Sequence, residues 1–133
     1  MIFPASLLPY DSEESLQLAA VLKEYKSLNC FNPSLIFLND RIIISFRAFP
    51  SEGQKNFHSY LLFYNQNDCS SKVIDLSQHY LKYGIDKVAD PKLTMLNDEV
   101  WVTFNTGYSK TENNLYVAQV FPEMQPPCLC RYA

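Results

Sequence analysis

The sequence contains little glycine and little charge. Its 133 residues include only three glycines, Gly53, Gly84 and Gly107, and these lie far apart. Phosphate-binding loops need several glycines close together, so nucleotide-binding loops of the P-loop and Rossmann kinds are excluded. Charged residues make up 19% of the chain and the net charge is −3, without the clustered lysine and arginine that nucleic acid binding requires. We therefore expect neither a nucleotide nor a nucleic acid as partner.

Membrane spans, export signals and metal-ligand motifs are also missing. The longest apolar run is far below the ~18 residues of a membrane helix, so no membrane partner is expected. The N-terminus lacks a positive region and its apolar stretch is interrupted by Pro4 and Pro9, which argues against a secretory signal. The four cysteines form no C-x-x-C pair and have no histidine cluster beside them. These absences predict a cytoplasmic protein with reduced thiols, no metal and no cofactor.

What remains is the composition of a packed globular chain, 47% hydrophobic and 14% aromatic. Residues 13–27 are predicted to form an amphipathic helix, because Ser12 can cap it and Glu13 and Glu14 suit its first turn. Apolar residues recur there at helical spacing: Leu18, Val21, Leu22, Tyr25 and Leu28. From Phe31 onward the apolar residues alternate with a period of two, which is typical of strands.

An internal repeat organises the rest of the chain. Residues 32–48 align without gaps on residues 90–106, with identity at six of 17 positions and a period of 58 residues (from 32 to 90). Each copy predicts a strand, a two-residue Asn-Asp turn and a second strand, since Asn and Asp tolerate the positive φ of such turns. A third strand follows in both copies, at 60–64 and at 115–120, and a fourth follows at 72–76 in the first copy alone.

Four antiparallel strands at a fixed period are typical of a β-propeller blade. We therefore predict an all-β fold in which one N-terminal helix precedes two antiparallel four-stranded blades, at about 31–77 and about 88–122, the second incomplete. Residues 1–133 then form a single partial propeller domain. A β-sandwich with accidental similarity is the alternative. Because a ring needs about four to eight blades, the prediction requires a longer parent chain, self-association to cover the incomplete ring, or an exposed sheet face.

The candidate site follows from the propeller arrangement. The innermost strand of each blade lines the central channel, so Asn32 and Asp90, at equivalent strand starts, should converge on one cavity. Arg47, on the neighbouring strand, is the only arginine inside a strand pattern. A carboxylate and a guanidinium at a channel mouth suit an anionic or polyhydroxylated ligand. The alternative is that Asx-Pro only shapes the turn into the strand, with the side chain accepting backbone N–H groups.

Other residue types carry weaker signals. His58 and His79 are isolated, with no serine or cysteine at a diagnostic spacing, and are expected to be surface or hydrogen-bonded structural residues. Four aromatic residues have ring faces that can stack on sugars, but aromatic residues in strands belong more often to sheet packing: Tyr60, Tyr64, Trp101 and Phe104.

The motifs also resemble a known family. The runs Phe31-Asn32-Pro33-Ser34-Leu35, Asn39-Asp40 and Ser45-Phe46-Arg47-Ala48 are similar to the first blade of the inverting β-mannoside phosphorylases and mannosidases, a glycoside hydrolase family with a five-bladed propeller. The run Ala89-Asp90-Pro91-Lys92 resembles the family's E-D-P-R motif, and Phe104-Asn105-Thr106 resembles the strand that follows it. The resemblance covers about residues 30–120 and departs from the motif at Ala89 and Lys92. Five-bladed furanosidases, which also carry D-P at blade starts, are a more distant likeness.

The resemblance implies that Asp90 is the general acid and that Asn32 and Arg47 bind sugar and phosphate. Lys92 and Asn105 stand at further substrate- or phosphate-binding positions. The implied function is hydrolysis or phosphorolysis of β-mannosides or related glycans, with inorganic phosphate as co-substrate in the second case. Since the family's further basic residues come from later blades, we expect this chain alone to be inactive. The alternatives are a non-catalytic sugar-binding or protein-interaction propeller fragment, and a free-standing β domain without a ligand.

Overall fold

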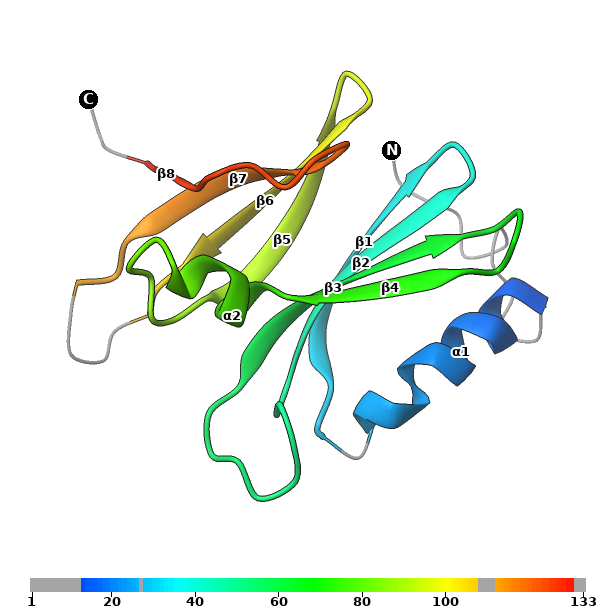
Figure 1. Cartoon of the computed structure of the whole chain (residues 1–133), viewed down its shortest axis with the longest axis horizontal. Coiled ribbons are helices and arrows are strands. Elements are labelled where there is room, and N and C mark those ends of the chain that lie inside the picture. The colour runs from blue at the N-terminus through cyan, green and yellow to red at the C-terminus, as the bar shows by residue number, and fades with distance from the viewer. Residues whose placement is uncertain (1–12, 27, 108–111, 131–133) are drawn as a thin grey trace.

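The structure, a computed structural model, describes residues 13–26, 28–107 and 112–130 (Figure 1). The helix cap predicted at Ser12 lies outside these residues. The strands form two four-stranded antiparallel sheets, ordered β1-β2-β3-β4 and β5-β6-β7-β8, which confirms the prediction of two such sheets. The elements are α1 (Glu13–Lys26), β1 (Phe31–Leu38), β2 (Arg41–Ala48), β3 (His58–Asn65), β4 (Ser71–Asp75), α2 (Leu76–Leu81), β5 (Ala89–Leu96), β6 (Glu99–Asn105), β7 (Leu115–Phe121) and β8 (Cys128–Leu129).

Each sheet opens with a hairpin that is closed by Asn-Asp. The turn between β1 and β2 has Asn39 at φ 53°, and the turn between β5 and β6 has Asn97 at 50° and Asp98 at 61°. Asn and Asp visit this left-handed region more readily than other side chains because their short polar groups bond locally. The positive φ expected of these turns is confirmed at the three positions, and both hairpins point to the same end of the molecule (Figure 1).

A β-bulge interrupts the first strand of both sheets at the same repeat position. In β1 the pair Asn32-Pro33 lies opposite the single residue Phe46, and in β5 the pair Asp90-Pro91 lies opposite Phe104. Asn32 and Asp90 have φ values of 52° and 50°. Because a bulge breaks the regular alternation of a strand, it redirects the side chain of its first residue. The Asx-Pro pair is therefore the local device that aims both Asx side chains.

Helix α1 and the second sheet cover opposite faces of the first sheet (Figure 1). Ile42, Ile44 and Phe46 form one buried face, against which α1 packs Leu18 and the partly buried Val21, Leu22 and Tyr25. The predicted apolar face of the helix is thus its packed face. The alternate residues of β2 and β3, including Ile43 and Leu61, belong to a core shared with Val100, Val102 and Phe104 of β6.

Serine side chains fix the two sheets together. Buried Ser45 donates through Oγ to the carbonyl oxygen of Pro91 at 3.1 Å. Buried Ser59 donates in the same way to the carbonyl oxygen of Val88 at 2.6 Å. A third bond of 2.9 Å runs from the backbone N–H of Leu93 to Oγ of Ser34. These bonds hold β5 against the first sheet on both sides of its bulge, so they set the position of Asp90.

A second helix was not predicted. The fourth strand of the first sheet ends at Asp75, and α2 begins at Leu76, where the sequence predicted a strand up to that residue. Oδ1 of Asp75 accepts a 3.0 Å bond from the N–H of Gln78, so Asp75 is the N-cap. Gly84, at φ 80°, follows the helix and takes the left-handed conformation common after a C-terminus. Among the described residues, no helix is long and apolar enough to cross a membrane.

The second sheet has a fourth strand that the sequence did not indicate. Residues 88–122 were predicted to form an incomplete blade, but β8 continues the sheet, with Cys128 paired to Val117 and Leu129 paired to Tyr116. Two residues after a proline-rich stretch are too few to show an alternating pattern. The pairing depends on main-chain groups, which any residue except proline supplies in full.

Candidate functional site

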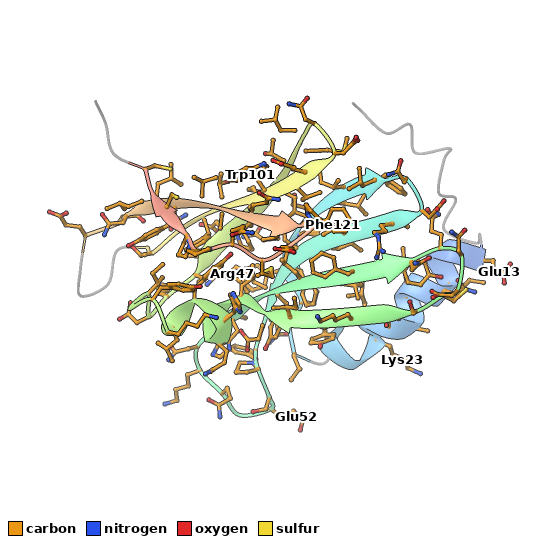
Figure 2. All side chains as sticks on the ribbon, turned by 45° about the horizontal axis from the view of Figure 1, so that its top comes forward. Glu13, Lys23, Arg47, Glu52, Trp101 and Phe121 are labelled. Carbon is orange, nitrogen blue, oxygen red and sulfur yellow. The ribbon has the colours of Figure 1, made fainter. Side chains whose placement is uncertain are left out.

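Four of the five predicted site residues meet where the two sheets come together. Asn32 donates through Nδ2 to Oδ1 of Asp90 at 3.2 Å, and Asn105 donates through Nδ2 to Oδ2 of Asp90 at 3.3 Å. Nη1 of Arg47 lies 3.8 Å from Oδ1 of Asp90. Figure 2 shows Arg47 at this junction of the sheets. We call Asn32, Arg47, Asp90 and Asn105 the Asp90 cluster.

The Asp90 cluster consists of two equivalent halves. In the first sheet, the bulge residue Asn32 lies beside Arg47, which pairs with Phe31. In the second sheet, the bulge residue Asp90 lies beside Asn105, which pairs with Ala89. Asn32 and Asp90 are 58 residues apart, which is the period of the repeat. The same local geometry, used twice, therefore brings four side chains to one place, as the sequence predicted for Asn32 and Asp90.

The carboxylate of the cluster is open and its guanidinium is covered. The side chain of Asp90 is 50% exposed and that of Arg47 only 14%. The Arg47 guanidinium carbon lies 5.4 Å from the ring centroid of Phe31 and 5.7 Å from that of Phe57, which are cation–π distances. Asp90 can therefore reach a ligand in solvent, while the two rings fix the guanidinium behind it.

The alternative interpretation of the Asx-Pro pairs gave their side chains a backbone-capping role. In the described residues, the hydrogen bonds of the Asn32 and Asp90 side chains run to one another and to Asn105. Asn105 is the residue that braces the backbone, since its Oδ1 accepts a 2.9 Å bond from the N–H of Gly107. The two Asx side chains are therefore committed to the cluster, and Asn105 ties the cluster to the loop after β6.

Lys92 stands apart from the other four residues. It lies two positions beyond Asp90, pairs with Thr103 of β6, and is exposed. Within the described part of the chain it forms no hydrogen bond or ion pair with the Asp90 cluster. Lys92 is exposed on the second sheet and therefore does not hold the Asp90 carboxylate.

A cavity of about 530 Å³ opens beside Arg47, and we call it the Arg47 pocket. Lys55 lines it from the loop between β2 and β3, His58 from the start of β3, and Lys87 from the segment before β5. Nδ1 of His58 lies 2.7 Å from Oδ2 of Asp75, in keeping with a hydrogen-bonded structural histidine. Sequence reasoning missed the pocket, because its lining comes from separate connections that share no motif.

The chemistry available at the site is that of hydrogen bonding and charge. In the described residues, no three His, Cys, Asp or Glu side chains are placed to hold a metal ion. Comparison with known proteins finds no matching family model, no matching curated protein and no matching solved structure. The likeness to β-mannoside phosphorylases and mannosidases thus rests on the sequence motifs, and the function has to be argued from the cluster itself.

Proposed function

We propose that the chain is a two-blade part of a carbohydrate-active β-propeller protein, and that its Asp90 cluster binds a glycan of the β-mannoside type. The observation that carries the proposal is the 3.2 Å hydrogen bond from Asn32 to Asp90, which joins equivalent strand starts 58 residues apart. In a propeller, the innermost strands of successive blades meet around a channel, so such a meeting is what the arrangement requires.

The packing of the two sheets supports the propeller part of the proposal. Ile43 of the first sheet shares a buried core with Val102 and Phe104 of the second sheet. Ser45 points to the same side and donates its hydrogen bond to the second sheet. The repeat counterparts of Val102 and Phe104 in the first sheet are Ile44 and Phe46, and these lie under α1. In both sheets, the equivalent positions of the second strand therefore pack against the element that comes before the sheet in the chain. Successive propeller blades pack in this order.

The chemistry of the cluster supports a polyhydroxylated ligand. A sugar hydroxyl both donates and accepts hydrogen bonds, so it pairs with a carboxylate and with an amide alike. Asp90 supplies an exposed acceptor, and Asn32 and Asn105 supply amides whose second N–H forms no hydrogen bond with the described residues. Because these three groups already orient one another, a sugar would meet a preformed set of partners with little ordering cost.

Phosphorolysis is a second candidate, favoured over hydrolysis by one observation. Inverting hydrolysis uses two carboxylates about 6.5–9.5 Å apart, whereas the described residues bring only one carboxylate, Asp90, into the cluster and place the cationic Arg47 beside it. In phosphorolysis, phosphate replaces the second carboxylate and its water. A phosphate oxygen bonds to the anomeric carbon and the glycosidic C–O bond breaks. Asp90 enters this step protonated, gives its proton to the leaving oxygen, and takes up a proton from solvent afterwards. The departures at Ala89 and Lys92 favour binding without turnover in this chain alone.

The binding proposal is tested by NMR titration of the labelled chain with β-1,4-mannobiose, with cellobiose as the comparison sugar. We expect mannobiose to shift the amide signals of Asn32, Asp90 and Asn105, and we expect Asp90→Ala to remove those shifts. Thr94→Ala is the matched control, because Thr94 is exposed on the same strand and outside the cluster. Shifts that avoid the cluster, or that survive Asp90→Ala, contradict the proposal.

Turnover is measured in the same samples. Mannobiose is incubated with inorganic phosphate, and mannose 1-phosphate is sought by phosphorus NMR. We expect none from this chain alone. Formation of mannose 1-phosphate that Asp90→Asn abolishes would instead establish the phosphorolytic candidate.

A further inference from the structure

The Arg47 pocket collects positive charge in a chain whose net charge is −3. Arg47 contributes from β2, Lys55 from the loop between β2 and β3, and Lys87 from the segment that leads into β5. Among the described residues that line it, Asp86 is the one with a carboxylate. Neutral donors from Asn56, Ser77 and Gln78 complete the wall. A concave site with three cations and several neutral donors suits an oxyanion.

The guanidinium of Arg47 has hydrogen-bonding capacity to spare. Its nearest carboxylate oxygen lies at 3.8 Å, beyond the range of a direct hydrogen bond. Its Nε is buried and has no hydrogen-bond partner among the described residues. A largely covered group that is always charged is costly without acceptors. Among the described residues, Arg47 is therefore held by an ion pair and two aromatic rings, and its Nε donor has no acceptor.

Lys87 connects the pocket to the other end of the Asp90 cluster. Its Nζ lies over Gly107, where an added Cβ would stand only 2.9 Å from it. The N–H of Gly107 donates to Oδ1 of Asn105 at 2.9 Å. Arg47 reaches Asp90 directly, and Lys87 reaches Asn105 through Gly107, so the pocket and the cluster adjoin at two points. A ligand of sugar size that contacts the cluster therefore has the cationic pocket within its reach.

We propose that the Arg47 pocket holds the anionic group of an acidic saccharide, whose hydroxyl groups contact the Asp90 cluster. The anionic group is a carboxylate or a phosphate carried by the sugar itself. Both present oxygens that match the planar donor face of an arginine. The assignment rests on the proposed glycan-binding function and narrows its ligand class from neutral sugars to acidic ones.

The test compares four probes by calorimetry: mannose, mannuronate, mannose 6-phosphate and inorganic phosphate. We expect at least one acidic sugar to bind about tenfold more tightly than mannose, the ratio that one charge-assisted hydrogen bond contributes. Whichever acidic sugar gains identifies the anion as carboxylate or phosphate. Added salt should reduce this gain, because screening weakens the attraction between charges.

Variants locate the effect. Lys55→Met should remove most of the gain of the acidic sugar and leave mannose binding unchanged, and Lys87→Met should also remove most of the gain. Lys72→Met is the matched control, since Lys72 is an exposed lysine of β4 outside the pocket. Thermal melts of each variant show whether it folds.

The outcomes separate the two proposals. If mannose binds at the Asp90 cluster but the acidic sugars bind no more tightly, the pocket assignment is wrong and the glycan-binding function stands. If none of the sugars binds, the glycan-binding function is wrong, and the assignment falls with it even where inorganic phosphate binds. If Lys72→Met removes the gain as fully as Lys87→Met, the attraction belongs to the overall surface charge and the pocket assignment is wrong.

Discussion

The two sheets are copies of one pattern placed in different surroundings. The first sheet is covered on both faces, by α1 and by the second sheet, whereas the second sheet packs through one face alone in the described residues. Ile43 and Ser45 are buried in the first sheet, and their counterparts Trp101 and Thr103 are half-buried on an outer face. Figure 2 shows Trp101 on the side of the molecule away from Glu13 and Lys23 of α1.

The comparison shows that the repeat preserves backbone features, whereas the residues on one face of each sheet depend on what packs against that face. Both sheets keep the Asn-Asp turn and the Asx-Pro bulge, which are properties of the backbone. They differ in the alternate face, where polar Lys92, Thr94 and Gln119 surround Trp101. An antiparallel sheet with one solvated face shows this alternation. Self-association, one of the three alternatives that the sequence left open, would bury a more polar surface here than the one between the two sheets.

The largest expected difference comes from Leu61→Ala and Val117→Ala, which truncate equivalent positions opposite Ser45 and Thr103. Leu61 is fully buried between the sheets, so its loss should lower the free energy of unfolding by about 2–5 kcal/mol. Val117 is half-buried on the outer face and should cost about 1 kcal/mol or less. Urea unfolding measures both. Equal losses would show that the outer face is covered in solution, which a dependence on protein concentration would trace to self-association.

A smaller difference in stability is expected when the hydroxyl groups of the equivalent residues Ser45 and Thr103 are removed. Ser45→Ala removes the bond to the carbonyl of Pro91 and leaves that buried oxygen without its donor, at a cost of about 1–3 kcal/mol. Thr103→Val removes the equivalent hydroxyl from the outer face with its shape retained, and should change stability by no more than about 0.5 kcal/mol. Thermal unfolding of both variants checks this. A cost for Thr103→Val that matches Ser45→Ala would contradict the contrast between buried and outer faces.

Features of the fold and the site could be predicted from the sequence where a local pattern of residues specifies them. The Asn-Asp turns and the helix face were predictable because residue type and spacing specify them, and the repeat placed Asn32 and Asp90 together. Helix α2 was missed although Asp75 and Gln78 have the spacing of a capping pair, since two turns are too short for a periodic signal. Strand β8 and the Arg47 pocket depend on tertiary packing, which leaves no pattern along the chain.

The equivalence of the two bulges can be tested by substituting their first residues. At Asn32 and at Asp90, glycine should give a more stable protein than alanine by about 1 kcal/mol, since both replacements lose the side-chain bonds but only alanine is strained at φ near 50°. Chemical denaturation of the four variants measures the difference. Asn56 is the control, because it does not have a positive φ and alanine should be no worse than glycine there. A preference for glycine at one bulge only would show that the two copies differ in backbone.

The smallest expected effect concerns α2, the element that joins the two sheets. Burial and then the nearby charge of Lys82 lower the pKa of His79 from its ordinary 6.5, so the folded protein keeps this ring neutral. As the pH falls through 6.5, the unfolded chain takes up the proton first, and stability should fall until the lowered pKa of the folded state is reached. His79→Gln removes this titration, so between pH 8 and about pH 5.5 its stability should fall less than that of the parent chain. Urea unfolding across this range measures both slopes. Identical slopes would mean that the ring titrates alike in the two states, and would place any loss of stability at moderately acid pH in groups other than His79.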